Sequence, residues 1–407
     1  MRQDGVQRWV ESAELSIKGG EEFQFGDWKT EEGCQGSCWH ECKNAKNIQN
    51  VQKARGLSPY LCPMPEILGA APFLSASADD LIILDVRSPA EYAHSHIPGA
   101  LSFPLFSDEE RHQVGYLYKQ VSQTAAMMKG LEYVGPKMSY FLERAMELSP
   151  QKEVGVYCWR GGKRSESIAW LLDQGGFKTT LLKGGYKAAR RYFLNQLERP
   201  WKLIRLAGRT GSGKTRILDA LKQHGEQVLD LEGMANHRGS AFGHLGLGGQ
   251  PSNEYFENQI GYQLDQCLPE RPIWVEDESR HIGRLTLPKP FWEQFQQAPA
   301  IFMDVPAEIR VQEILKEYGI QELRGLRDSF HRISRKMGPQ LVKEAIELLD
   351  REDLEGAARL ALAYYDRTYD YHLRNHTTGP VINEEVTSLD YGRIADRMIE
   401  IRQQIMT

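Results

Sequence analysis

Cysteine is scarce in this chain, and long apolar runs are missing. Six cysteines among 407 residues are too few for a disulfide scaffold, which excludes the small disulfide-rich secreted classes. No apolar run approaches the roughly 20 residues that a membrane-spanning helix needs. The opening residues, Met1–Gly5, lead into no apolar segment of the kind found in secretory signals. We therefore expect a cytoplasmic protein with no membrane partner.

An excess of positive charge is missing as well. Lys and Arg total 50 against 55 Asp and Glu, so the formal net charge is −5. Nucleic acid cannot be bound through bulk charge by such a chain, and any contact must use local basic patches. Apolar residues make up 41% of the chain, which is enough for sizeable cores, and the length predicts two or three domains.

Residues 1–75 differ from the rest of the chain because they are polar and show no sustained periodicity. We expect a poorly ordered N-terminal extension. Four of the six cysteines fall here, and they are Cys34, Cys38, Cys42 and Cys62. Their spacing, with His40 among them, leaves a metal site open but does not favour one, because such sites usually contain paired C-x2-C units.

From residue 76 onward the pattern is that of an α/β protein, with short apolar runs typical of buried parallel strands. We predict a first α/β domain over residues 76–200, a second over 201–307, and a helical region over 308–407. The strands are expected at residues 81–86, 154–157, 179–182, 203–207, 272–276 and 300–304. The C-terminal helices are expected at residues 308–318, 340–350, 354–374 and 391–406.

A phosphate-binding loop follows the first strand of the second domain. The segment Gly208–Thr215 matches G-x-x-x-x-G-K-[ST] and lies between a strand and an amphipathic helix. Its backbone N–H groups and the helix N-terminus bind phosphate oxygens, while Lys214 reaches the outer phosphate and Thr215 can hold Mg²⁺. The predicted phosphate-binding residues are Gly208, Arg209, Gly211, Ser212, Gly213, Lys214 and Thr215. The motif does not distinguish a diphosphate from ATP.

Two further segments are candidates for the same site. Asp277 and Glu278 follow the strand predicted at residues 272–276, where one of them could help to hold the metal. The alternative for both is a solvated strand end. The loop His237–Ser240 could line the phosphate site, or it could be a Gly-rich surface loop.

A cysteine lies at the corresponding place in the first domain. Cys158 ends the strand predicted at residues 154–157 and opens a basic, Gly-rich loop before a helix. Inward N–H groups and the cations Arg160, Lys163 and Arg164 should lower the pKa of this thiol and favour the thiolate. Cys267, in contrast, lies on a predicted helix and is expected to serve packing.

The first α/β domain resembles rhodanese domains, which move sulfur through a cysteine persulfide. The resemblance is carried by Asp85–Arg87, His96–Ala100, the Cys158 loop and Lys183–Tyr186, in that order. Sulfurtransferase loops of this family read C-x4-R, whereas Cys158 and Arg164 are spaced C-x5-R. A wider loop suits a bulkier cargo, such as selenium or a phosphate-like oxyanion, and is similar to the loop of phosphatases built on the rhodanese fold.

A rhodanese domain joined to a phosphate-loop domain resembles the tRNA 2-selenouridine synthase family. Further segments carry this resemblance over residues 78–375, and they are Gly115–Gln120, Asp230–Gly233, His237–Gly243, Phe256–Asn258 and Glu276–Arg280. The resemblance implies a transferase that acts on the wobble uridine in the anticodon of certain tRNAs. Geranyl diphosphate and selenophosphate are the implied co-substrates, and a selenophosphate-supplying enzyme is an implied partner.

The family's activity is a two-step exchange in which 2-thiouridine is S-geranylated and selenium then replaces the geranylthio group. The family's selenium-carrying cysteine matches Cys158. A selenium atom there could be stabilised by the loop N–H groups with Arg160, Lys163 and Arg164. Binding of geranyl diphosphate at Lys214 and its loop is our hypothesis.

Two basic stretches could contact the phosphates of an RNA. The candidates are Lys187, Arg190, Arg191, Arg332, Arg335 and Lys336. The segment Tyr364–Arg374 interleaves aromatic and basic residues and could stack an unpaired base. The alternatives are tyrosines that pack in a helical bundle and charges that face water.

Three other functions remain open from the residues alone. The chain could be a phosphate-loop ATPase or kinase joined to a rhodanese-type sulfurtransferase domain. It could be a phosphatase that uses the C-x5-R loop, although the sequence identifies no acid to protonate the leaving oxygen. It could also be a non-enzymatic scaffold, which an intact Cys158 and a complete phosphate loop disfavour.

Overall fold

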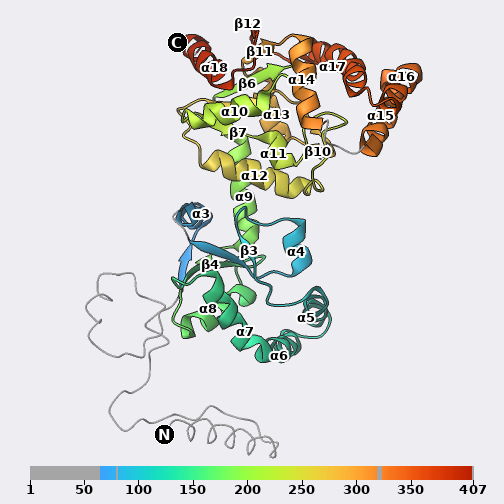
Figure 1. The fold of residues 1–407 in the computed structure, drawn as a ribbon. Helices are drawn as coiled ribbons and strands as arrows, with labels where there is room; N and C mark the ends of the chain where they lie inside the picture. Colours follow the sequence, from blue (N-terminus) through green and yellow to red (C-terminus); the bar gives the residue numbers. More distant parts are fainter. Residues whose placement is uncertain (1–64, 79–80, 319–322, 406–407) are drawn as a thin grey trace, which may run out of the picture. The chain divides into compact units, whose positions relative to one another are not determined.

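The computed structural model describes residues 65–78, 81–318 and 323–405 (Figure 1). The four N-terminal cysteines and most of the predicted extension lie outside these residues, so the predictions made for them stay predictions. Within the described ranges, no helix combines the length and the apolar character needed to cross a bilayer.

The first sheet contains five parallel strands in the order β1-β5-β4-β2-β3. The strands are β1 (Glu66–Leu68), β2 (Ile82–Asp85), β3 (Leu101–Ser102), β4 (Glu153–Tyr157) and β5 (Lys178–Leu182). The short apolar runs become its buried central strands, as expected for a sheet covered on both faces. The sheet begins earlier than the predicted boundary at residue 76, because β1 pairs with β5 and helix α3 (Ala70–Ala78) buries Phe73 and Leu74.

Helices surround this sheet. They are α4 (Pro89–His94), α5 (Asp108–Gln120), α6 (Gln123–Val134), the 3-10 turn η4 (Gly135–Lys137), α7 (Met138–Leu148), α8 (Lys163–Gln174) and α9 (Gly185–Glu198). Phe141 of α7 and Ile168 of α8 join Val154 and Val156 of β4 in one apolar core. Cys158 lies at the edge of that core, so the sheet fixes the position of its loop.

The second sheet also contains five parallel strands, in the order β12-β11-β6-β8-β7. The strands are β6 (Leu203–Gly208), β7 (Gln227–Leu229), β8 (Ile273–Glu276), β11 (Ala300–Asp304) and β12 (Val381–Glu385), with a small antiparallel hairpin of β9 (His281–Ile282) and β10 (Leu285–Thr286). Its helices are α10 (Lys214–Gln223), α11 (Leu231–Ala235), α12 (Asn253–Asp265), α13 (Lys289–Gln297) and α18 (Tyr391–Ile405). Ligands of such sheets bind beyond the carboxyl ends of the strands, where the loop after β6 lies.

The helical region differs from the prediction at its end. Helices α14 (Ala307–Tyr318), α15 (Leu323–Met337), α16 (Pro339–Asp350) and α17 (Leu354–His376) follow β11. Residues 381–385 then form β12, which pairs in parallel with β11, and α18 packs its apolar face into the core beside β6 and α10. The expectation of helices to the end of the chain was wrong here, because a five-residue edge strand with alternating exposure gives too short a pattern to detect.

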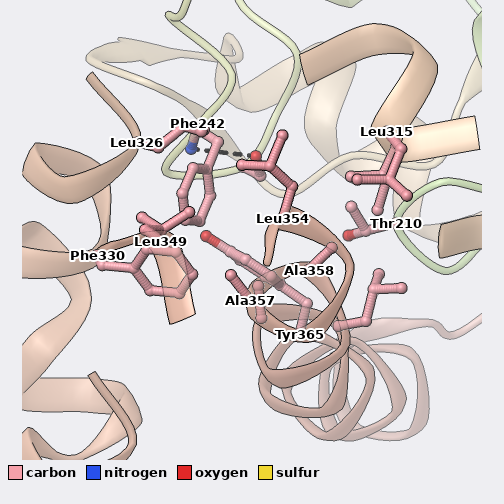
Figure 2. A pocket seen from close by; sticks show the side chains of 14 residues that line it. Thr210, Phe242, Leu315, Leu326, Phe330, Leu349, Leu354, Ala357, Ala358 and Tyr365 are labelled. Carbon is pink, nitrogen blue, oxygen red and sulfur yellow. Dashed lines mark hydrogen bonds between the residues drawn. The ribbon is translucent and has the colours of Figure 1, made fainter. Parts of the chain in front are cut away.

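Helices α15, α16 and α17 group together beside the second sheet (Figure 1). They share an apolar core that also takes in Phe242 and Leu245 from the loop after α11. Phe242 and Phe330 meet edge to face with ring centroids 5.0 Å apart, an arrangement favoured by the aromatic quadrupole. Figure 2 shows this side-chain cluster around a pocket between α15, α16 and α17.

Candidate functional site

The strand β4 delivers Cys158 to a turn that donates hydrogen bonds to its sulfur. The Gly162 amide donates to Sγ at 3.3 Å, and the Ser165 hydroxyl lies 3.2 Å from the same atom. Burial raises the pKa of the Cys158 thiol, but these donors and the nearby Arg164 charge outweigh it, so the pKa lies below its ordinary value. The side chain is 4% exposed and touches the apolar core on its other side. A thiolate is therefore stabilised here mainly by directed hydrogen bonds.

The predicted cationic ring around Cys158 is only partly formed. Arg164 donates to Glu91 of α4 at 2.6 Å, and this pairing outweighs burial and lowers the pKa of the Glu91 carboxyl. Lys163 is 79% exposed and pairs with Glu166 one turn further along α8, while Arg160 is exposed. Because carboxylates already hold two of the three cations, their contribution to the thiolate is smaller than the sequence suggested.

Two glycines allow the Cys158 turn to pack directly against the turn after β5. Gly161 and Gly185 have φ of +64° and +60°, a left-handed conformation that favours glycine. A Cβ at Gly185 would lie 2.2 Å from the Cys158 carbonyl oxygen, and one at Gly161 would lie 2.7 Å from the Leu182 carbonyl oxygen. The Tyr186 amide then donates to the Cys158 carbonyl at 2.8 Å. The backbone of the cysteine turn is thereby fixed from both sides.

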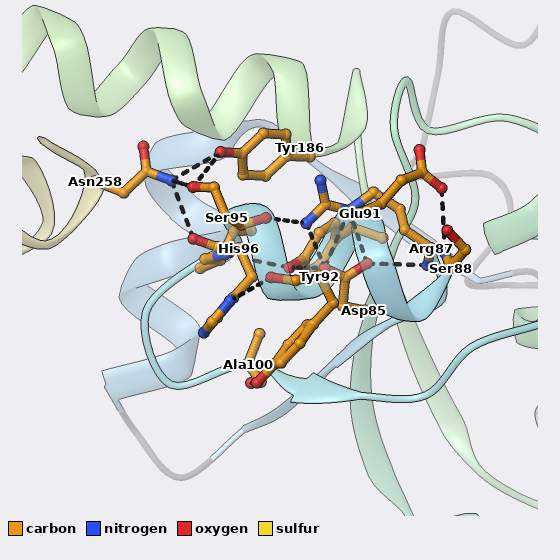
Figure 3. Close-up of polar contacts among 12 residues, drawn as sticks. Asp85, Arg87, Ser88, Glu91, Tyr92, Ser95, His96, Ala100, Tyr186 and Asn258 are labelled. Atoms are coloured by element: carbon orange, nitrogen blue, oxygen red, sulfur yellow. Dashed lines mark hydrogen bonds and ion pairs between the residues drawn. The ribbon is translucent and has the colours of Figure 1, made fainter. Parts of the chain in front are cut away.

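A buried polar network connects the end of β2 with the loop after α4 (Figure 3). Arg87 forms a bidentate ion pair with Asp85 and donates to the Ser95 carbonyl at 2.7 Å. The Tyr157 hydroxyl donates to the same Asp85 carboxylate at 2.6 Å. Asp85 and Arg87 belong to the rhodanese-like motif, and all four residues are buried, so their role in this structure is to hold the loops in place.

Helix α12 of the second domain completes this network. Asn258 is fully buried, and its amide donates to Ser95 Oγ, the His96 carbonyl and the Tyr186 hydroxyl within 3.0 Å (Figure 3). Arg190 of α9 donates to Asn258 Oδ1 at 3.0 Å and pairs with Glu257. Arg190 was predicted to contact RNA, whereas in the structure its guanidinium links α9 to Asn258 and Glu257 of α12. No local signal distinguishes a contact of this kind, because both partners are polar helix residues.

The second loop has the geometry of a phosphate cradle. Gly211 and Gly213 adopt φ of +81° and +75°, and Lys214 Nζ donates to the Gly208 carbonyl at 3.0 Å. A cavity of about 300 Å³ lies over this loop, and Thr210 through Arg216 contribute to its wall. Arg238, Gly239 and Ser240 line the same cavity, so this segment lies beside the loop, as expected, although His237 itself is buried and does not line the cavity.

Carboxylates face Lys214 across the cavity. Thr215 Oγ1 lies 3.3 Å from Glu232 Oε2, and Glu232 shares a hydrogen bond with Glu278. Burial raises the pKa of both carboxyls, and their mutual repulsion raises that of Glu278 further, so the pair tends to retain a proton. No group of three or more His, Cys, Asp or Glu side chains that could hold a metal is found among the residues the structure describes.

Asp277 and Glu278 make different contacts, although the sequence offered both as candidates to hold the metal. Its carboxylate accepts a hydrogen bond from Arg205 at 2.9 Å and one from the Tyr369 hydroxyl at 2.7 Å. Tyr369 in turn accepts a hydrogen bond from the Gly208 amide at 3.0 Å. Asp277 is therefore engaged in fixing the start of the phosphate loop, whereas Glu278 is paired with Glu232 in the wall of the cavity.

Tyrosines of α17 lie in the wall of this cavity, which sequence reasoning missed. Tyr365 and Tyr369 were candidates for stacking on a base, but both line the cavity over the phosphate loop. The Tyr365 hydroxyl accepts a hydrogen bond from the Ala241 amide at 3.1 Å, and burial raises the pKa of Tyr365 to about 12. Arg209 was predicted to bind phosphate, but in this structure its guanidinium forms ion pairs with Asp370 and Asp304.

Both loops lie in domains that match models of known protein families. The model of the tRNA 2-selenouridine synthase AAA domain matches residues 201–391, and that of the rhodanese-like domain matches residues 72–191. A tRNA 2-selenouridine synthase of Aeromonas salmonicida is 35% identical over 337 residues, which span 73% of this chain and 88% of the relative. One of a Sulfurovum species is 32% identical over 350 residues, which span 77% and 95%. The chain belongs to the tRNA 2-selenouridine synthase family.

This member of the tRNA 2-selenouridine synthase family presents several of the predicted RNA-contacting cations on its surface. Lys187 and Arg191 are exposed on α9, and Arg335 and Lys336 are exposed at the end of α15. Arg332 is exposed too and lies within hydrogen-bond distance of His244. Cys267 is partly buried against the core, and burial raises the pKa of its thiol to about 11, which agrees with a packing role.

Proposed function

We propose that this chain converts the wobble 2-thiouridine of tRNA into 2-selenouridine in two chemical steps. The phosphate loop would bind geranyl diphosphate for S-geranylation, and the Cys158 loop would release selenium from selenophosphate. The observation that supports this division most directly is the presence of two different anion-stabilising loops on two parallel sheets. One surrounds a cysteine sulfur with donors, and the other forms an open cradle.

In the geranylation step, the sulfur on C2 of the base attacks the allylic C1 of geranyl diphosphate. A C–S bond forms while the C1–O bond breaks, diphosphate leaves with the electron pair, and the base loses its N3 proton. Lys214, the amides of the loop and Arg238 are the groups that could stabilise the charge on the leaving diphosphate. The N-terminus of α10 adds its partial positive charge to the same place.

In the selenation step, selenium becomes bonded to C2 and geranylthiolate leaves with the electrons of the C–S bond. Selenium in selenophosphate is at the oxidation level of selenide, so the net exchange needs no oxidant, and phosphate is released when water later cleaves the S–P bond formed at Cys158. Alkylation makes the thiocarbonyl sulfur a workable leaving group. The Cys158 thiolate would attack phosphorus of selenophosphate, so that an S–P bond forms, the P–Se bond breaks and selenide leaves with the electron pair to attack C2. The donors around Cys158 Sγ stabilise the attacking thiolate.

The oxygens at the phosphate loop also fit a Mg²⁺ ion. Thr215 and Glu232 offer hard oxygen ligands, and Mg²⁺ in phosphate sites takes its remaining ligands from the substrate and water. A bound Mg²⁺ would neutralise charge on the diphosphate. Thr215 and Glu232 would hold it, with Glu278 close enough to Glu232 to influence its proton.

The tRNA would bind through exposed cations rather than through the net charge of the chain. Lys187 and Arg191 on α9 and Arg335 and Lys336 on α15 are the residues we propose for phosphate contacts. Affinity for tRNA should therefore fall as salt is added, and salt-independent binding would contradict this part of the proposal.

Nucleoside mass spectrometry tests the two steps together. Thiolated tRNA is incubated with geranyl diphosphate and selenophosphate and either wild-type protein, Cys158→Ala or the control Cys267→Ala. Wild type and the control should yield 2-selenouridine, whereas Cys158→Ala should stop at S-geranyl-2-thiouridine. If Cys158→Ala forms 2-selenouridine at the wild-type rate, the role of Cys158 in selenium transfer is wrong. Rapid ATP turnover without tRNA, with no geranylation, would instead favour a phosphate-loop ATPase.

A further inference from the structure

A second cavity adjoins the phosphate cavity and has a different character. It holds about 70 Å³ and lies between α14, α15, α16 and α17. Its wall is built almost entirely from apolar side chains, among them Phe242, Leu326, Phe330, Leu349, Leu354 and Ala358 (Figure 2). Small apolar cavities of this kind stay dry and take apolar ligands, because water there would find no partners.

The two cavities share part of their walls. Thr210 of the phosphate loop, Ser240, Ile314 of α14 and Tyr365 of α17 line both of them. These four residues therefore lie between the cradle and the apolar space, where a chain attached to phosphates in the cradle would have to run. The polar and apolar ends of the combined site are set by different parts of the sequence, one by the loop after β6 and the other by the helices after β11.

We propose that this apolar cavity binds the terminal isoprene unit of the allylic diphosphate whose phosphates lie in the loop Gly208–Thr215. The inference rests on the proposed geranylation at that loop, and it assigns the recognition of chain length to the helices α14–α17. The region that sequence reasoning offered as an RNA contact thus also forms a substrate-binding wall.

A purine base does not suit the same space. The amine and ring nitrogens of adenine need hydrogen-bond partners, and leaving them unpaired in an apolar pocket costs more than the burial gains. The hydroxyl groups in the wall belong to Thr210, Ser240 and Tyr365, and two of them already take part in bonds. Ser240 Oγ accepts from the Phe242 amide at 3.2 Å, and Tyr365 accepts from the Ala241 amide at 3.1 Å.

The size of the cavity predicts which chain fits best. Its 70 Å³ are about half of the roughly 150 Å³ in an engineered apolar cavity that binds the six carbons of benzene, so the cavity has room for no more than one isoprene unit. A ten-carbon geranyl chain would lie across the shared wall and place its last unit inside. A five-carbon chain would leave the cavity empty, and a fifteen-carbon chain would meet the side chains of Phe330 and Leu349.

Calorimetric titration of the full chain with defined diphosphates tests this predicted preference for chain length. The probes are inorganic pyrophosphate and the dimethylallyl, geranyl and farnesyl diphosphates, with ATP for comparison. Geranyl diphosphate should bind at least about tenfold more tightly than dimethylallyl diphosphate, which is the scale expected for burying several methylene groups. It should also bind more tightly than farnesyl diphosphate.

A pair of alanines on α17 provides matched variants. Ala358 lines the cavity, and Ala363, on the same helix, is exposed and contributes nothing to its wall. Ala358→Phe should weaken geranyl diphosphate about tenfold or more, leave pyrophosphate unchanged, and remove the preference for geranyl over dimethylallyl. Ala363→Phe should behave as wild type. Phe330→Leu, which enlarges the cavity mildly, should improve farnesyl diphosphate relative to geranyl diphosphate.

The outcomes separate this inference from the function on which it rests. If pyrophosphate does not bind the wild-type chain, the diphosphate role of the loop is wrong, and so is the proposed isoprene site in the apolar cavity. If pyrophosphate binds but chain length has no effect, or if Ala358→Phe changes nothing, the loop assignment stands and the isoprene site is wrong. If Ala358→Phe weakens the binding of ATP, the apolar cavity binds the adenine base and not an isoprene unit.

Discussion

The Cys158 turn and the phosphate loop share a construction but differ in where they stabilise negative charge. Each follows a central parallel strand, contains at least one left-handed glycine and leads into a helix. The first turn directs its donors at a sulfur atom of the protein, whereas the second surrounds an open cavity of about 300 Å³. The first arrangement suits the nucleophile that we propose there, and the second suits the proposed leaving group on a ligand.

The carboxylates beside the two loops differ in the same sense. Burial raises the pKa of Glu91, but the ion pair with Arg164 beside the Cys158 turn outweighs it and lowers that pKa. Near the phosphate loop, burial and neighbouring acids raise the pKa of Glu276 and of the pair Glu232 and Glu278. The acid at the first site is therefore ionised and paired with an arginine, whereas the acids at the second site tend to retain protons.

The largest effect is expected at the phosphate loop. Lys214→Ala removes the side chain that we propose contacts the leaving diphosphate, so geranylation should fall by about 10²–10³-fold. Formation of S-geranyl-2-thiouridine, followed by mass spectrometry, measures the rate. Lys222→Ala, at an exposed position of the same helix, is the control. Equal rates for the two variants would mean that the loop does not stabilise the leaving diphosphate.

Opposite pH dependences of stability are expected for two carboxylates. Glu276 retains its proton in the folded state to a higher pH than in the unfolded chain, so it costs stability as pH rises above the ordinary carboxyl range. Glu276→Gln should therefore gain stability relative to wild type between pH 5 and pH 8, by about 1 kcal/mol. Glu91 has a lowered pKa, so its contribution is present at neutral pH and is lost as pH falls through that pKa.

Thermal unfolding of both variants across pH measures this contrast. Glu91→Gln should be less stable than wild type at pH 7, by about 1 kcal/mol, and the difference should shrink toward pH 3. Glu344→Gln, at an exposed position of α16, should show neither trend. If the stability differences of the Glu91 and Glu276 variants from wild type change with pH in the same direction, the proposed electrostatic contrast between the two sites is wrong.

The sequence predicted these loops well because their chemistry is local. A strand, a glycine pattern and a basic or cysteine residue within eight positions were enough to locate Cys158 and Lys214. Asn258, Tyr365 and Tyr369 could not be assigned in this way, because each contacts a loop from a helix that is distant in the sequence. Helical periodicity indicates which face of α17 is buried, but it does not identify the cavity that this face lines.

The smallest effect is expected at the thiol. Ser165→Ala removes the hydroxyl donor to Cys158 Sγ and should raise the pKa of that thiol by about half a unit to one unit. The pH dependence of alkylation, followed for the Cys158 peptide by mass spectrometry, gives the midpoint. Cys267, whose pKa burial raises to about 11, serves as the internal reference. An unchanged Cys158 midpoint would show that the hydroxyl does not stabilise the thiolate.

The division of labour between the two loops is tested most directly with tRNA that is already S-geranylated. Such tRNA is given to Lys214→Ala and to Cys158→Ala together with selenophosphate, and 2-selenouridine is measured over time. Because geranylation is no longer needed, Lys214→Ala should form 2-selenouridine at the wild-type rate, whereas Cys158→Ala should form none. Failure of Lys214→Ala on this substrate would contradict the account, since it would show that the phosphate loop is needed for the selenium step as well.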